Sequence, residues 1–206
     1  MALQPSFRAC IVAGSPAAPH TLDIFLDYVC PFSGKMTRAI DSVLKPLLDA
    51  GGQYEGKVKV IFRNQVQPWH ASSTFVHEAG VAVAMVAPQK FWPFTVLLMN
   101  RQEEFYDIPS SKLTPLQIRE QLADVASKSG LDDGELKAFK DALVLKSTPN
   151  GGTSVTDALK YTVKFARQNS IHVSPTVLWD GLVANEISSS WGEKEWSEFL
   201  AAKVTV

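Results

Sequence analysis

The stretch FLDYVCPFSGKM, residues 25–36, places an apolar run directly before a Cys-Pro-Phe-Ser sequence that begins at Cys30. Residues 20–29 are mostly apolar with β-branched and aromatic members, which predicts a buried strand. After Pro31, apolar residues recur at helical spacing until Pro46, which predicts a kink or a stop. The sequence therefore places Cys30 where a strand ends and a helix begins.

A cysteine in the first turn of a helix can be a nucleophile. The unpaired N–H groups and the positive end of the helix macrodipole favour the thiolate over the thiol. Pro31 suits the first helical position, and Ser33 lies on the same turn, where its hydroxyl could donate a hydrogen bond to the thiolate. The simpler alternative is that Cys30 acts only as a small buried hydrophobic residue. Because a proline and a helix start both follow Cys30, we expect a functional thiol.

The composition restricts the classes of function. The chain has 206 residues, 46% of them hydrophobic, and a net charge of −1, which suits one domain and indicates neither a nucleic-acid nor a membrane partner. The apolar stretch near the N-terminus is interrupted by Gly14 and Pro16, so we expect a short strand or arm there and no signal peptide. Two cysteines make no disulfide framework. Together these features predict a cytoplasmic protein.

The sequence then predicts a strand at 57–62, a helical block at 72–146 and a helix at 154–168. A hairpin at 174–184 and a last helix from Ser190 onward follow. Thr114-Pro115-Leu116-Gln117 predicts a capping box inside the helical block. Asp180-Gly181 predicts the hairpin turn, and Ser190-x-x-Glu193 predicts the cap of the last helix. The pattern is therefore α/β with a long helical insertion.

This order of elements, with Cys-Pro after a strand and Val-Ser-Pro-Thr at 173–176, resembles the thioredoxin superfamily. The long insertion, DYVCPFS at 27–33 and FRNQVQPWH at 62–70 resemble its DsbA-like branch, whose cytoplasmic members are oxidoreductases. The resemblance implies a thioredoxin-like fold, in which helices flank a central mixed sheet, with an inserted all-helical subdomain. We expect one domain over residues 1–206. Its thioredoxin core comprises residues 20–71 and 147–206, and the helical insertion comprises residues 72–146.

The resemblance also implies which residues form the site. Cys30 matches the nucleophile of the family, and the substrate-binding positions match Pro31, Phe32, Ser174, Pro175 and Thr176. Pro175 matches the cis-proline that packs beside the sulfur, although an edge-strand proline fits the same pattern. The Ser174 backbone would pair with a thiol- or disulfide-containing protein or with glutathione as co-substrate. A homodimer is a further possibility, and neither a tightly bound cofactor nor a metal is expected.

The sequence departs from the dithiol members of the family at one position. They have Cys-x-x-Cys, whereas Ser33 stands at the second position here and cannot attack a mixed disulfide. Phe32 replaces a polar or basic residue that stabilises the thiolate in some members, which predicts weaker stabilisation of the Cys30 thiolate. Cys10 could resolve a mixed disulfide only with its Cα within about 7 Å of that of Cys30, and it is more simply a packed small residue. We therefore expect glutathione or another external thiol to complete the reaction.

Other functions fit parts of the sequence. Kappa-class glutathione transferases and hydroxychromene-carboxylate isomerases share the helical insertion and use Ser-Pro-x-Ser, whose serines match Cys30 and Ser33. A non-catalytic binding protein of the same fold is a third possibility. Monothiol glutaredoxins, which bind iron–sulfur clusters, have glycine where Pro31 stands. Neither a metal-ligand spacing nor the signature of a cysteine hydrolase is present. His70 could lie near the site or on the surface, and the aromatic cluster at 91–94 could form core, a groove or a dimer face.

Overall fold

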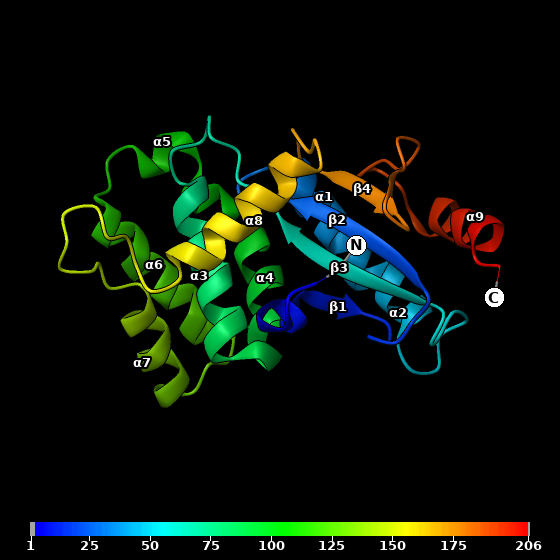
Figure 1. Ribbon diagram of the computed structural model, residues 1–206, viewed down its shortest axis with the longest axis horizontal. Coiled ribbons are helices and arrows are strands. Elements are labelled where there is room, and N and C mark those ends of the chain that lie inside the picture. The colour runs from blue at the N-terminus through cyan, green and yellow to red at the C-terminus, as the bar shows by residue number, and fades with distance from the viewer. Residues whose placement is uncertain (1–2, 206) are drawn as a thin grey trace.

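The computed structural model describes residues 3–205, whose strands form one sheet in the order β1–β3–β2–β4–β5 (Figure 1). The strands are β1 (Ile11–Ala13), β2 (His20–Leu26), β3 (Val58–Asn64), β4 (Thr176–Trp179) and β5 (Leu182–Val183). The β2 and β3 strands are parallel, and the other neighbours are antiparallel. The sheet is therefore mixed, as the thioredoxin-like fold requires.

Helices cover both faces of this sheet. They are α1 (Pro31–Ala39), α2 (Lys45–Leu48), α3 (Ser73–Val86), α4 (Phe91–Asn100), α5 (Asp107–Ser110), α6 (Pro115–Lys128), α7 (Asp133–Ala142), α8 (Thr156–Gln168) and α9 (Glu193–Lys203), with short turns η1 (Pro5–Cys10), η2 (Ile40–Leu44), η3 (Pro88–Lys90) and η4 (Gln102–Phe105). The α8 helix crosses the front of the sheet in Figure 1, α1 and α2 lie behind it, and α3 to α7 gather beside it. No helix among residues 3–205 is long and apolar enough to span a bilayer.

The central strand β2 is buried along almost its whole length, which explains its nearly continuous apolar sequence. Its one acidic residue, Asp23, pairs with Arg63 on β3 at 2.7 Å. The strand ends at Leu26 and not at residue 29 as expected. The reason is local, because the Asp27 carboxylate accepts the N–H of Val29 at 2.8 Å and turns the chain out of the sheet.

The short strand expected near the N-terminus is present as β1, and a 3₁₀ turn, η1, that the sequence did not predict precedes it. One other expectation needs correction. The last helix is capped at Gly192 and not at Ser190. The Glu195 carboxylate accepts the Gly192 N–H at 2.9 Å, while the hydroxyl of Ser190 lies 2.9 Å from that of Ser188. The helix therefore begins after Gly192, two residues later than the predicted cap.

Several local expectations are confirmed. The Thr114 capping box opens α6, and Asp180 and Gly181 have φ values of 48° and 89° in the β4–β5 turn. The kink near Pro46 takes the form of a π turn, η2, directly before it. A regular α-helix would set the ring of Pro46 against the Ser42 carbonyl, and the wider turn avoids this clash.

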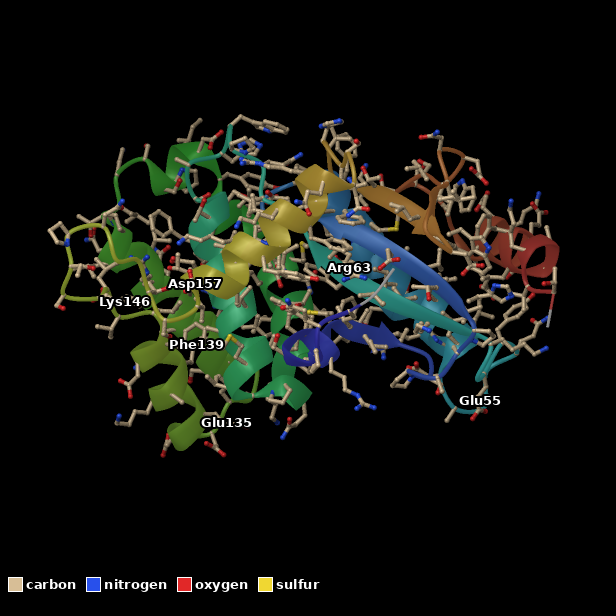
Figure 2. All side chains as sticks on the ribbon, in the orientation of Figure 1. Glu55, Arg63, Glu135, Phe139, Lys146 and Asp157 are labelled. Atoms are coloured by element: carbon tan, nitrogen blue, oxygen red, sulfur yellow. The ribbon has the colours of Figure 1, made fainter. Side chains whose placement is uncertain are left out.

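The insertion packs against the sheet through its own aromatic core. Phe91 and Phe94 are fully buried and belong to the core, whereas Trp92 is only partly buried. Phe139 on α7 (Figure 2) lies with its ring centre 6.3 Å from that of Phe94. Tyr28, which follows β2, reaches the same core and lies against Gly80 of α3. Residues close to Cys30 are thus fixed by the insertion as well as by the sheet.

Gly80 generates a prediction about stability. A Cβ at this position would lie 2.6 Å from the hydroxyl oxygen of Tyr28, which is fully buried. We expect Gly80→Ala to lower the free energy of unfolding by about 1–3 kcal/mol, because the tyrosine has no room to move. Urea unfolding measures the change. Gly134→Ala, in the exposed first turn of α7, is the matched control, and an equal loss there would contradict the packing explanation.

Candidate active site

Cys30 lies at the start of α1, as the N-cap residue, with Pro31 at the first helical position. Its carbonyl accepts the Gly34 N–H at 3.1 Å, and its side chain is largely buried, with 6% of the residue exposed. The thiol donates a hydrogen bond to the Ser174 carbonyl at 3.4 Å, and the Ser174–Pro175 peptide bond is cis. The structure therefore brings together the two motifs singled out in the sequence.

The other substrate-binding candidates surround this contact. Phe32, two residues after Cys30, is 56% exposed, and the Lys35 ammonium lies 5.5 Å from the centre of the Phe32 ring. The Thr176 hydroxyl donates to the Val173 carbonyl at 2.8 Å and so braces the loop before β4. The Ser174 hydroxyl is buried and has no hydrogen-bond partner among residues 3–205.

Ser33 lies inside the protein. Its residue is fully buried, and its hydroxyl oxygen accepts the Asp27 N–H at 3.1 Å. This contact ties the first turn of α1 to the loop that follows β2. The hydrogen bond from Ser33 to the Cys30 thiolate stays a prediction.

Asp27 joins three segments beneath Cys30. Besides the Val29 N–H, its carboxylate accepts the Gln67 N–H at 2.7 Å and the Ser73 hydroxyl at 2.5 Å. The Nε2 atom of His77 lies 3.6 Å from the same carboxylate. The loop after β2, the loop after β3 and the start of α3 therefore meet on one buried carboxyl group.

The charge of Asp27 is maintained by these contacts. Burial by itself raises the pKa of the carboxyl, but His77, the Ser73 hydroxyl and the Val29 N–H outweigh it, so the pKa of Asp27 lies below its ordinary value. The sequence marked Asp27 only as part of a resembling motif, and its partners come from elsewhere in the chain. A polar residue at the end of a buried strand was the one available signal.

Gln102 is a second residue that the sequence did not reveal. It belongs to η4 in the helical insertion, is 6% exposed, and its amide donates to the carbonyls of Tyr28 and Cys30 at 3.0 and 3.2 Å. A glutamine in a helical block carries no local signal of such a role. Its contact with the active-site turn depends entirely on the tertiary fold.

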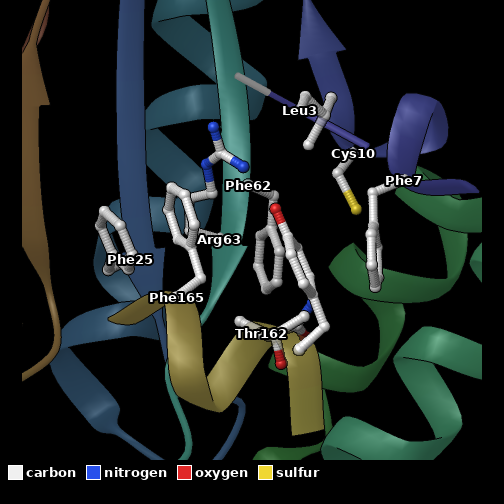
Figure 3. Close-up of a pocket in the computed structure, with 10 residues that line it drawn as sticks. Leu3, Phe7, Cys10, Phe25, Phe62, Arg63, Thr162 and Phe165 are labelled. Atoms are coloured by element: carbon white, nitrogen blue, oxygen red, sulfur yellow. The ribbon is translucent and has the colours of Figure 1, made fainter. Parts of the chain in front are cut away.

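Cys10 lies apart from this site. Figure 3 shows it in a small cavity of about 20 Å³ with Phe7, Phe62 and Arg63. Both cysteines are free, and burial raises the pKa of the Cys10 thiol to about 12, although Arg63 opposes the shift. The interpretation of Cys10 as a packed small residue agrees with this environment.

His70 lies at the edge of the site. Its Nδ1 atom is 3.0 Å from Asp107, and both residues line a cavity of about 320 Å³ that also contacts Pro31 and Tyr106. The two are partly exposed, so this cavity opens beside the first turn of α1. Within residues 3–205, His, Cys, Asp and Glu side chains nowhere form a group of three or more that could hold a metal ion.

Asp27 generates a prediction about stability and pH. We expect Asp27→Asn to lower the free energy of unfolding by about 2–4 kcal/mol near neutral pH, since an amide cannot replace a buried charged acceptor. The pKa of Asp27 is lowered on folding, so its contribution is complete above the unfolded-state value of about 3.9 and is lost as the pH falls further.

The measurement is urea unfolding of the parent and of Asp27→Asn, repeated from about pH 6 to about pH 3. The difference between the two proteins should shrink as the solution becomes more acidic. A difference that stays constant over this range would show that the charge of Asp27 is not what stabilises the turn.

Comparisons with known proteins agree with this geometry. A family model described as thioredoxin matches residues 8–202. A solved structure from Pseudomonas syringae, described as a "putative protein-disulfide isomerase", is 28% identical with a TM-score of 0.72, and the match covers 93% of this chain and 97% of that one. A search of curated proteins found no match.

Two more distant structures share the fold. The thiol-disulfide oxidoreductase MdbA from Corynebacterium matruchotii is 22% identical with a TM-score of 0.61, over 86% of this chain and 83% of that one. BdbD from Bacillus subtilis is 20% identical with a TM-score of 0.63, over 98% and 97%. Because the family model covers almost the whole sequence, the chain belongs to the thioredoxin family, with the fold of its DsbA-like members.

Proposed function

We propose that the chain is a thiol-disulfide oxidoreductase that uses one nucleophilic sulfur, that of Cys30. The observation that carries this proposal is the contact of the Cys30 thiol, at the N-terminus of α1, with the Ser174 carbonyl before Pro175. The descriptions of the Pseudomonas syringae structure and of MdbA support the same class of activity. The site offers a nucleophile, a helix N-terminus to stabilise its thiolate, and a backbone segment beside it.

The reaction consists of two exchanges. The Cys30 thiolate attacks one sulfur of a substrate disulfide, forms a mixed disulfide and releases the other sulfur as a thiolate. A second thiol then attacks the mixed disulfide as its own thiolate, which frees Cys30 and leaves a new disulfide on the substrate sulfur. The number of disulfides does not change, so no further oxidant is required.

The second thiol comes from outside the chain in this proposal. The hydroxyl of Ser33 occupies the position where a dithiol enzyme has its second sulfur, and it accepts the Asp27 N–H. Cys10 is buried in an apolar cavity, and its pKa of about 12 leaves little thiolate at neutral pH. Glutathione is the abundant small thiol that we propose as the resolving co-substrate.

The surroundings of Cys30 support a peptide-like substrate, which includes glutathione. The main-chain groups of Ser174, directly before the cis peptide bond, can hydrogen-bond to a peptide backbone as an added strand does. Phe32, two residues after Cys30, and Val173, directly before Ser174, are both 56% exposed. An extended segment could lie between these two apolar side chains with its sulfur at Cys30.

The nucleophile is tested by substitution. We expect Cys30→Ser to lose glutathione-dependent reduction of a small model disulfide to the uncatalysed rate, because an alcohol does not replace a thiolate in exchange. Cys10→Ala is the matched control and should stay within about twofold of the parent, since the buried thiol takes no part. Glutathione conjugation that persists in Cys30→Ser and disappears in Ser33→Ala would contradict the proposal and indicate a glutathione transferase.

The external resolving thiol is tested at Ser33. We expect Ser33→Cys to release glutathione from its mixed disulfide with Cys30 at least about tenfold faster than the parent when no thiol is added, because the introduced thiol lies on the same turn. Ser33→Ala should release it as slowly as the parent. The rate is followed by the free glutathione that appears. Rapid release from the parent itself would show that the chain already holds a resolving thiol.

A further inference from the structure

We propose that Gln102 is a positioning residue that holds the Cys30 turn in its reactive geometry from the side of the helical insertion. Its Nε2 atom donates to the Tyr28 carbonyl at 3.0 Å and to the Cys30 carbonyl at 3.2 Å. Both acceptors belong to the turn that carries the nucleophile, so one amide fixes the backbone on either side of Val29. This inference rests on the proposed function in that Cys30 is the reacting group.

The orientation of the Gln102 amide is fixed by its partners. The two carbonyls require a donor, so they face the NH₂ group of the amide. The remaining amide oxygen, Oε1, accepts the Tyr106 hydroxyl at 3.0 Å. Gln102 is 6% exposed, and both the NH₂ group and the oxygen of its amide have hydrogen-bond partners.

Gly34 provides independent evidence for this contact. A Cβ at position 34 would lie 2.7 Å from the Oε1 atom of Gln102, which shows that the amide packs directly on the first turn of α1. The Gly34 N–H also donates to the Cys30 carbonyl at 3.1 Å. Gln102 and Gly34 thus hold the same carbonyl oxygen from two sides, and the glycine leaves space for the glutamine.

The effect on Cys30 is both geometric and electrostatic. Carbonyl oxygens carry partial negative charge, and a donor on each of them reduces its repulsion of a nearby thiolate. The same donors keep the turn from relaxing, which keeps the sulfur in line with the N-terminus of α1. Loss of the amide should therefore slow every reaction of the Cys30 thiolate, whichever electrophile is used.

The charged and titratable groups around this turn are Asp27 in the turn, His77 on α3, His70 in the loop after β3, Lys35 and Arg38 on α1, and Glu103, Tyr106 and Asp107 from the insertion. Substitution of Gln102 alone leaves all of them in place. A change in the pH profile of Cys30 would therefore report on the amide itself and not on the loss of a neighbouring charge.

The test is the alkylation rate of Cys30 with iodoacetamide as a function of pH, in a Cys10→Ala background so that a single thiol reacts. We expect Gln102→Leu to lower the rate near neutral pH by about 3- to 10-fold and to move the midpoint of the profile to higher pH, as the loss of one or two hydrogen bonds implies. Gln102→Glu should lower it further, because an ionised carboxylate would face two carbonyl oxygens.

Two more variants keep the test decisive if the substitutions at Gln102 prevent folding. Tyr106→Phe removes the hydroxyl that orients the amide, and a smaller change in the same direction is expected. Thr95→Val is the matched control, since the hydroxyl of Thr95, from the same insertion, hydrogen-bonds to the side-chain hydroxyl of Tyr28 at 3.2 Å and not to the backbone of the turn. It should lower the thermal stability without moving the alkylation profile.

An alkylation profile of Gln102→Leu or Tyr106→Phe that coincides with that of the parent would overturn the proposal, whatever the change in stability. Because alkylation requires neither a disulfide substrate nor glutathione, this result is independent of whether the chain catalyses disulfide exchange. A chain that alkylates as expected but exchanges no disulfide would refute the proposed function and leave the role of Gln102 intact.

Discussion

The structure around Cys30 depends on one buried carboxylate, that of Asp27. A carboxylate inside a protein is tolerated only when its oxygens are paired, and here two backbone N–H groups and the Ser73 hydroxyl supply the pairing. These donors come from the loops after two neighbouring parallel strands and from the start of α3. The carboxylate therefore holds together the end of the sheet beside Cys30, and it fixes the strand-to-helix connection as a defined turn.

The insertion completes this turn from the other side. The amide of Gln102 bonds to the same short segment that Asp27 anchors, and Tyr28 packs into the insertion against Gly80. The helical insertion is thus part of the geometry of the candidate site as well as a cover for the sheet. A thioredoxin core without it would keep the Gly34 N–H on the Cys30 carbonyl but would lack the Gln102 amide that donates to the carbonyls of Tyr28 and Cys30.

The position of Cys30 between strand and helix could be predicted from the sequence because its signals are local. An apolar strand, a cysteine and a proline at the first helical position lie within a few residues of one another, and Ser33 stands in the same turn. Ser174 and Pro175 were found through a resembling motif, and the hairpin through its Asp-Gly dipeptide. Their meeting with Cys30 required the fold.

The supporting residues could not be predicted, because their partners are distant in the sequence. His77 and Ser73 resemble ordinary polar residues of a helical block, and Gln102 has no pattern of its own. The end of β2 was misplaced for the same reason, since apolar character continues through Val29 while the Asp27 carboxylate redirects the backbone. The cap of the last helix was misplaced because the Glu195 carboxylate accepts the Gly192 N–H, which the Ser190-x-x-Glu193 pattern does not reveal.

The most direct test of the central claim is a crystal structure of the chain after reaction with oxidised glutathione. We expect glutathione in a disulfide bond with Cys30, its backbone hydrogen-bonded to the main chain or hydroxyl of Ser174, and Cys10 unmodified. Glutathione attached to Cys10, or held without a covalent bond beside Ser33, would contradict the assignment of Cys30 as the single nucleophile.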